Sequence, residues 1–331
     1  MYQSSINIKP ETISIITPSY NQGVFLAETI KSVISQEGDF VLDYIIVDGG
    51  STDNSIKVIK QYEQMLEQGL WHVKCAHITF RWVSEKDHGQ TDALMKGFAM
   101  AEGAVLAWIC SDDVYLPETL QAVHNFFHEN SSAALLYGDA YYCDTAGTTI
   151  GHYPVEEFKF GKLAYFNFFC QPSTFFRREA FEAAGGLNSS LNFAMDYDLF
   201  VRIGKNLPCC YLRQYLSKYR LHNTSKTICN DALYKNHEES LRIAIKHFGW
   251  APLNRVYGSC NYYCLAQLPK FLTRIRPIVI LTSLIVTIFR SLLLNRGVRK
   301  NDLQLLTFAN SRKLFVKRED ILLGEQGSKS P

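Results

Sequence analysis

Two adjacent carboxylates, Asp112 and Asp113, directly follow the short apolar segment 104–110. This segment has the length and continuous apolarity of a strand that is buried on both faces. Open α/β sheets bind ligands beyond the carboxyl ends of such strands, where two neighbouring carboxylates can face one hard cation and its phosphate oxygens. A different interpretation is that Ser111-Asp112-Asp113 only turns the chain and caps a helix that begins near Pro117. The first interpretation predicts a divalent metal that holds a nucleotide diphosphate.

Three earlier strands are predicted to end in the same kind of polar loop. They cover residues 12–17, 43–47 and 79–83, and a helix is predicted after each, at about 24–36, 55–67 and 93–101. With the strand at 104–110 they make four β-α units, which predict a doubly wound, mostly parallel α/β sheet with one ligand crevice. A dinucleotide-binding fold is disfavoured, because the residues after the first strand, P-S-Y-N-Q-G, lack the G-x-G-x-x-G pattern.

The second half of the chain adds two polar residues next to predicted elements. Asp196 lies in the first turn of a helix that is predicted to begin near Phe193, where the helix dipole alone could account for a carboxylate. His222 follows the last predicted strands and could equally be an ordinary residue at a strand end. The strands predicted in this half are short, and a long helix follows them: 134–138, 140–143, 210–212, 216–221 and the helix at 228–248.

The composition is that of a globular protein. The chain has 331 residues, of which 47% are hydrophobic and 20% charged, enough for one large domain with an appendage. Its nine cysteines show neither a C-x-x-C pair nor a metal-binding spacing, which suits a reduced, cytoplasmic setting. Residues 1–10 are polar, so no N-terminal signal sequence is expected.

Positive charge is concentrated towards the C-terminal end. Residues 270–331 contain twelve Lys and Arg against four Asp and Glu, although the net charge of the whole chain is only +2. These basic residues flank the uncharged segment 277–289, so a membrane surface is a better candidate partner than a nucleic acid. Residues 277–294 are short for a membrane span, and an interfacial or re-entrant helix is the preferred interpretation. A single transmembrane helix and a plain packing or dimer helix are the alternatives.

Five motifs, in this order, resemble those of the family 2 glycosyltransferases, which have the GT-A fold. They are S-I-I-T-P-S-Y-N at 14–21, V-D-G-G-S-T-D at 47–53, S-E-K-D-H-G-Q-T-D at 84–92, S-D-D at 111–113 and M-D-Y-D-L at 195–199. The resemblance covers about residues 12–226 and implies a GT-A glycosyltransferase domain over residues 1–226. Residues 227–331 would form a helical C-terminal region with a basic, apolar segment at about 270–300, and this region is expected to associate with a membrane.

The resemblance implies roles for individual residues around the nucleotide. Pro18 and its neighbours, Tyr20 among them, would line the nucleotide base and ribose together with Asp48, whose carboxylate can accept from a uracil-type ring N–H. Asp112 would bind the ribose side. Three acidic loop residues would lie beside the nucleotide or the donor sugar, unless they only form a solvated turn and a helix cap: Glu85, Asp87 and Asp92.

The same resemblance divides the chemistry among three other residues. Asp113 would ligate Mg²⁺ or Mn²⁺ on the diphosphate, and His222 would reach the metal or the diphosphate from the opposite side. Asp196 matches the catalytic base, which takes the proton of the acceptor hydroxyl as it attacks the anomeric carbon. Asp198 is the rival for this role, and a structural role is preferred for it. A metal-bound diphosphate leaves as an anion, so no second carboxylic acid is needed.

The implied function is an inverting, metal-dependent transfer of a hexosyl or N-acetylhexosaminyl group from a UDP-type donor to a hydroxyl of a glycan. The glycan would be carried on a lipid at the inner face of a bacterial plasma membrane, in polysaccharide, lipopolysaccharide or capsule biosynthesis. The enzyme would be cytoplasmic and peripheral on that membrane. Q-x-x-R-W, the motif of processive synthases, is absent from the sequence, so one transfer per encounter is expected.

The sequence departs from the family pattern at two positions, and two other functions are compatible with parts of the pattern. Ser111 stands where many relatives carry an aspartate, and Met95 stands where an asparagine is usual, so contacts on the donor side can differ. A nucleotidyltransferase also uses carboxylate-bound metal, but residues 18–23 contain no basic residue to grip a phosphate. A catalytically silent nucleotide-binding or scaffold protein would keep the same fold.

Overall fold

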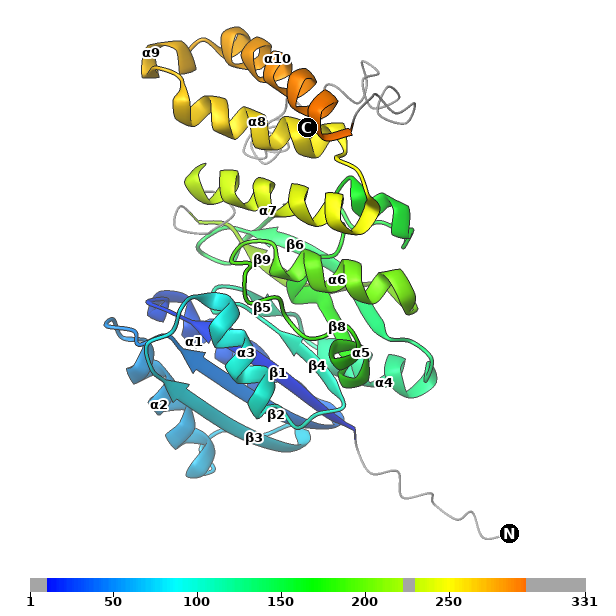
Figure 1. Ribbon diagram of the computed structural model, residues 1–331. Helices are drawn as coiled ribbons and strands as arrows, with labels where there is room; N and C mark the ends of the chain where they lie inside the picture. The colour runs from blue at the N-terminus through cyan, green and yellow to red at the C-terminus, as the bar shows by residue number, and fades with distance from the viewer. Residues whose placement is uncertain (1–10, 223–229, 296–331) are drawn as a thin grey trace, which may run out of the picture.

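The computed structural model describes residues 11–222 and 230–295, whose arrangement is shown in Figure 1. Their centre is one mixed sheet with the strand order β3-β2-β1-β4-β8-β6-β9-β5, and β7 pairs with β6 beside it. The strands are β1 Thr12–Ser19, β2 Gly38–Asp48, β3 Cys75–Ser84, β4 Val105–Trp108, β5 Val114–Tyr115, β6 Leu135–Cys143, β7 Thr149–His152, β8 Thr174–Arg177 and β9 Cys209–Arg220.

The first four strands confirm the predicted parallel half of the sheet. β1 lies between β2 and β4, β2 also pairs with β3, and all three pairings are parallel. The register places Ser19 beside Asp48 and Asp48 beside Ser84, so three strands end level with one another. The polar loops that follow these strands therefore leave the sheet at one edge.

The other half of the sheet is mixed and differs from the prediction. β8 pairs antiparallel with β4 and β6, β6 pairs parallel with β9, and β9 pairs antiparallel with β5. The short strands predicted at 134–143 and 210–221 are in each case one continuous strand. Their mutual register shifts around Asp139, where a polar residue interrupts the apolar pattern, so the predicted break is a bulge. β5, β7 and β8 were not predicted, because two to four residues are too few to show a period.

Helices cover both faces of the sheet, each with its own hydrophobic cluster. α1 Gly23–Ile34, α2 Ser55–Glu67 and α4 Thr119–Glu129 contribute to one cluster, and α3 Gln90–Met100, α5 Arg178–Ala183 and α6 Met195–Asn206 to the other. Two short 3₁₀ turns, Phe160–Ala164 and Gln171–Ser173, lie in the connections. Trp108 at the end of β4 stacks on Phe200 of α6 with ring centroids 6.0 Å apart, which fixes α6 over the edge where β4 ends.

Four further helices extend the structure beyond the sheet: α7 Asn230–Phe248, α8 Leu253–Gln267, α9 Lys270–Thr273 and α10 Arg276–Asn295. α7 lies between α6 and α8, and α10 runs along α8 at the outer end (Figure 1). The sequence pattern predicted α7 and the apolar part of α10 but not α8, whose Tyr, Cys and Asn residues show no clear amphipathic period. The predicted domain boundary at 226–227 lies outside the described residues, as do residues 296–331 of the basic tail.

The approach of residue 103 to β1 gives a test of this packing. A Cβ atom at Gly103 would lie 2.6 Å from the backbone oxygen of Thr12 and 2.6 Å from the backbone nitrogen of Ser14, and neither atom can move without breaking β1. Gly103→Ala is therefore expected to lower the free energy of unfolding by about 1–3 kcal/mol, measured by urea denaturation.

Gly161→Ala is the matched control, because a Cβ there meets nothing within 4 Å. Its free energy of unfolding should stay within about 0.5 kcal/mol of the unchanged protein. Equal stability of the two variants would contradict the close approach of residue 103 to β1.

Candidate active site

A cavity of about 700 Å³ opens where β1 and β4 end. Its walls come from the loops after the parallel strands, from the first turn of α6 and from α7. Six of the residues predicted from the sequence line it: Pro18, Tyr20, Asp87, Asp112, Asp113 and Asp196. The other four lie outside this lining: Asp48, Glu85, Asp92 and His222.

The loops after β1 and β2 are fastened to each other. Asn21 has a left-handed backbone with φ of 51° and donates its N–H to Ser51 Oγ at 2.7 Å. Its side-chain Oδ1 accepts from the N–H of Thr52 at 2.8 Å. These reciprocal bonds fix the loop that carries Pro18 and Tyr20 against the neighbouring loop.

Asp48 shapes the second of these loops from behind. It is fully buried, and its carboxylate accepts from the N–H groups of Gly50 and Ser51 at 3.1 and 2.8 Å. It also accepts from the hydroxyls of Ser51 and Ser84 at 2.5 and 2.8 Å. The structure thus gives Asp48 the role of holding the loop whose Gly49 lines the cavity, and a direct contact of Asp48 with a nucleotide base stays a prediction.

The acidic loop after β3 presents one of its three carboxylates to the cavity, that of Asp87. Glu85 and Asp92 both lie near Nζ of Lys96 in α3, at 2.8 and 3.4 Å. A hydrogen bond from the backbone N–H of His88 and the charge of Lys96 lower the pKa of Asp92. Glu85 and Asp92 therefore stabilise the loop through Lys96, and their contact with a donor sugar stays a prediction.

Asp113 is held in place by the end of β9. Its Oδ1 accepts from the backbone N–H of Arg220 at 2.8 Å. The buried guanidinium of Arg220 donates to four oxygen atoms, which are the carbonyl oxygens of Asp112, Asp144 and Thr145 and a carboxylate oxygen of Glu28. Burial, together with the charge of Asp112, raises the pKa of Asp113 well above its usual value. Two such neighbouring carboxylates ionise most readily when a cation lies between them.

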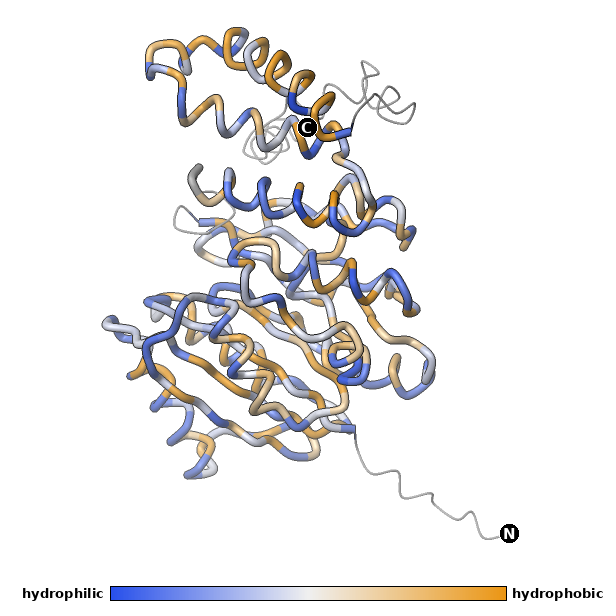
Figure 2. The backbone as a smooth tube through the Cα atoms, viewed as in Figure 1, coloured by the Kyte–Doolittle hydropathy of each residue, from blue (hydrophilic) through white to orange (hydrophobic). Residues whose placement is uncertain are grey.

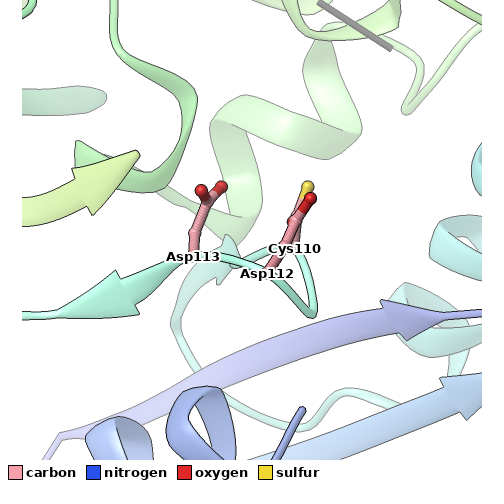
Figure 3. A group of neighbouring side chains, drawn as sticks. All are labelled: Cys110, Asp112 and Asp113. Carbon is pink, nitrogen blue, oxygen red and sulfur yellow. The ribbon is translucent and has the colours of Figure 1, made fainter. Parts of the chain in front are cut away.

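Cys110, Asp112 and Asp113 lie close enough together that they could hold a metal ion. One sulfur and two carboxylate oxygens, one from each residue, lie within 4.8 Å of one another. Figure 3 shows the three side chains pointing to the same side of the turn that links β4 to β5. Gln90 donates its side-chain amide to Cys110 Sγ at 3.2 Å and so orients the thiol. Cys110 was not predicted from the sequence, although its position directly ahead of Ser111-Asp112-Asp113 was a signal.

His222 stands next to this group. Its Nε2 lies 2.9 Å from Asp112 Oδ2, and its ring packs on Phe25 with centroids 4.9 Å apart. His222 therefore supports one carboxylate of the group, and its own reach to a metal or a diphosphate stays a prediction. Residues 223–225, which follow it in the chain, lie outside the described residues.

Asp196 reaches the same cavity from the first turn of α6. Its side chain is partly exposed to the cavity and otherwise enclosed by protein. This burial raises the pKa of Asp196 to about 6, the charge of Glu239 adds to the rise, and backbone N–H groups oppose it. A carboxyl group with this pKa is ionised at neutral pH and is a stronger base than an exposed aspartate.

The neighbouring acid Asp198 is committed to structure. It is buried, and its two carboxylate oxygens lie 2.8 Å from Nε of Arg202 and 3.3 Å from Nε2 of His247. The contact with His247 joins α6 to α7, and the two contacts agree with the structural role preferred for Asp198 from the sequence.

Glu239 of α7 fixes the segment that leads into α6. Its carboxylate accepts from three backbone N–H groups, those of Asn192 at 3.1 Å and of Phe193 and Ala194 at 2.8 Å. These N–H groups precede Asp196, so Glu239 sets where the helix begins and where Asp196 points. Glu239 was not predicted from the sequence, because a carboxylate that binds backbone groups more than forty positions away leaves no local pattern.

The strand order, the helices on both faces and the cavity at the strand ends define the GT-A class of fold, and solved structures agree. TarS of *S. aureus*, residues 1–349 in complex with UDP-GlcNAc, aligns with a TM-score of 0.52 at 13% identity, over 85% of this chain and 89% of that one. The mannosyltransferase PcManGT of *Pyrobaculum calidifontis*, in complex with GDP-Man and Mn²⁺, aligns with a TM-score of 0.54 at 14% identity, over 96% of this chain and 84% of that one.

The sequence matches the family model of Glycosyl transferase family 2 over residues 14–185, just over half of the chain, and the chain belongs to this family. It is 28% identical over 238 residues to a PGL/p-HBAD biosynthesis glycosyltransferase of *Mycobacterium tuberculosis*, covering 70% of this chain and 86% of the relative. It is 24% identical over 258 residues to chondroitin synthase of *Escherichia coli*, covering 76% of this chain. The match spans only 36% of the length of that synthase.

Amide hydrogen exchange tests the contact made by Glu239. Glu239→Gln leaves one acceptor oxygen for three N–H groups, so exchange of the amides at 192–194 is expected to accelerate at least about tenfold. Lys246→Gln is the control, since Lys246 is exposed two turns further along α7 and should leave this exchange unchanged. Unchanged protection of these amides in Glu239→Gln would show that α6 begins correctly without the acid.

Proposed function

We propose that this protein transfers one hexosyl or N-acetylhexosaminyl group from a UDP-sugar to a hydroxyl of a glycan, with inversion and with Mn²⁺ or Mg²⁺ as cofactor. The observation that carries the proposal is that one cavity is lined by the group of Cys110, Asp112 and Asp113 and by the raised-pKa carboxyl of Asp196. The family membership and the nucleotide-sugar complexes of TarS and PcManGT support the donor class.

Cys110, Asp112 and Asp113 would hold the metal against the diphosphate. When bound, the metal offsets the negative charge that develops on the leaving nucleoside diphosphate. A thiol is a softer ligand than a carboxylate, so Cys110 shifts the preference of the site from Mg²⁺ towards Mn²⁺. His222 keeps the Asp112 carboxylate oriented for this task.

Asp196 acts as the general base. It takes the proton of the acceptor hydroxyl while that oxygen attacks the anomeric carbon, and the donor bond to the diphosphate breaks. The base comes from α6 and the metal-binding group from the turn after β4, so attack and departure are served by separate elements, as an inverting displacement requires. No second carboxylic acid is needed, because the diphosphate leaves as an anion.

The acceptor side of the cavity has the chemistry of a sugar-binding surface. The half-buried rings of Tyr153, Phe193 and Tyr219 are part of its lining and can stack on the apolar face of a pyranose. The amides of Asn167 and Asn236 lie in the same lining and can pair with hydroxyl groups. We infer a glycan acceptor carried on a lipid at the cytoplasmic face of the plasma membrane, in the synthesis of a bacterial surface polysaccharide.

Calorimetric titration of the full chain with UDP tests the metal site. Binding is expected with Mn²⁺ present and should weaken at least about tenfold when EDTA removes it, because the diphosphate then faces two carboxylates. Asp113→Asn keeps an acceptor for the Arg220 N–H but removes the charge, and a similar loss is expected. Asp144→Asn is the control, since Asp144 caps its own turn outside the cavity lining.

Metal-independent binding of UDP would contradict this site. Failure to bind any nucleotide diphosphate would favour the catalytically silent scaffold. Titration with Cd²⁺ tests the thiol separately, because a Cd²⁺–thiolate bond gives an ultraviolet charge-transfer band that Cys110→Ser should weaken.

Asp196→Asn tests the base. Transfer should fall by at least about a thousandfold, at the level expected for loss of a general base, while UDP affinity with Mn²⁺ stays nearly the same. In the unchanged protein, kcat/KM should fall below about pH 6, where Asp196 becomes protonated. Loss of UDP binding in the variant would remove Asp196 from the role of base.

The same variant has an expected stability signature. The folded-state pKa of Asp196, about 6, is above its unfolded value, so its ionised form lowers stability once the pH passes through this range. Asp196→Asn should therefore be more stable than the unchanged protein at pH 8, by about 1–3 kcal/mol, and equally stable near pH 4. Lower stability of the variant at pH 8 would contradict the burial of this charge.

A further inference from the structure

An ordinary surface helix buries its large apolar side chains and exposes its polar ones, and α10 has the reverse arrangement. Small and hydroxyl-bearing residues spaced four apart are buried against the protein: Val279, Ser283, Thr287 and Ser291. The opposite stripe, also spaced four apart, is large, apolar and exposed: Leu281 (61%), Ile285 (47%), Phe289 (66%) and Leu293 (82%). Figure 2 shows this hydrophobic helix at the outer end of the molecule. Helices that face lipid have small residues at their protein contacts and large apolar residues outside.

Polar contacts hold the inner face of α10 against the rest of the protein. Arg290 pairs with the carboxylate of Glu238 in α7, at 2.7 and 3.0 Å, and donates to Ser259 Oγ at 2.6 Å. Asn295 exchanges two hydrogen bonds with the backbone of Ala251, at 2.8 and 2.9 Å. Among the described residues, α10 is the helix that is long and apolar enough to cross a membrane. These contacts tie it instead to two largely polar helices, which favours a position along the membrane surface.

The exposed apolar stripe continues into α9 and is bordered by positive charge. Phe271 and Ile275 are exposed beside α10, and the exposed Lys270, Arg274 and Arg276 lie in the same stretch of chain. Residues 270–295 contain no Asp or Glu at all. An apolar stripe with cationic borders is complementary to a bilayer with anionic headgroups. The acyl chains would contact the apolar stripe, and the headgroups would pair with the basic side chains.

We propose that the outer face of α10, together with Phe271 and Ile275 of the α9 segment, lies in the interface of an anionic lipid bilayer, with the helix axis along the membrane plane. A second copy of this chain is a poorer occupant, because two identical faces would bring the same uncompensated cations together. The tail at 296–331 is also a poorer occupant, since its sequence carries eight basic against four acidic residues. Membrane binding by this face does not require the proposed function. Only the position of the enzyme beside a lipid-linked acceptor rests on it.

Vesicle sedimentation of the full chain tests the proposal. The protein should bind vesicles of phosphatidylcholine with about one third phosphatidylglycerol, and bind vesicles of phosphatidylcholine alone about tenfold more weakly. The triple variant Leu281→Gln/Phe289→Gln/Leu293→Gln should lose at least about tenfold in affinity for the mixed vesicles. Lys270→Gln/Arg274→Gln should lose affinity for the mixed vesicles only. Leu70→Gln, which changes an exposed leucine outside the C-terminal helices, is the matched control and should bind as the unchanged protein does.

Two further measurements on the same samples separate the possible failures. Circular dichroism and UDP binding confirm that each variant is folded, so a loss of vesicle binding reports on the surface itself. Equal vesicle binding by the triple variant and the unchanged protein would overturn the proposal. A dimer that the triple variant dissociates, without vesicle binding, would assign the face to a second copy and also overturn it. If the unchanged protein binds vesicles but never UDP, the proposed function fails while this inference stands.

Discussion

The candidate active site depends on one buried cation, the guanidinium of Arg220. It joins the turn after β4, the turn between β6 and β7, and α1, through three backbone carbonyl oxygens and one carboxylate oxygen. The backbone of the same residue holds Asp113, so the strand that brings the cation also positions the carboxylate. A buried charge of this kind is stable only when its hydrogen-bonding partners surround it. The end of β9 is thereby fastened to the turn after β4 and to α1.

A second constraint joins the sheet to the C-terminal helices. Asp196 sits at the start of α6, where unpaired backbone N–H groups would normally lower the pKa of a nearby carboxyl. Glu239 binds three N–H groups just ahead of α6, and its negative charge raises the pKa of Asp196 against the lowering by the N–H groups of Asp196 and Tyr197. α7 therefore shapes the candidate site, although the family match ends at residue 185.

The sequence predicted those features that repeat along the chain or stand next to a strand end. The four β-α units, the carboxylates Asp112 and Asp113 and the position of Asp196 were predicted for this reason. Cys110 and Glu239 were not, because a thiol becomes a candidate ligand only once the turn brings it beside two carboxylates, and Glu239 acts on backbone groups distant in sequence. β8 was also missed, because four residues are too few to show a period. Only their pairing with β4 and β6 identifies them as a strand.

The contact made by Glu239 also bears on how such a protein can evolve. Because the acid binds backbone N–H groups, the contact does not depend on the identity of the side chains at 192–194, whereas it does depend on the acid itself. A recombination event that exchanged the C-terminal helices for those of another protein would have to deliver a carboxylate to the same point. The sheet and α7 are thus expected to be inherited as one unit, and new acceptor specificities to arise through loops and outer helices rather than by exchange of whole modules.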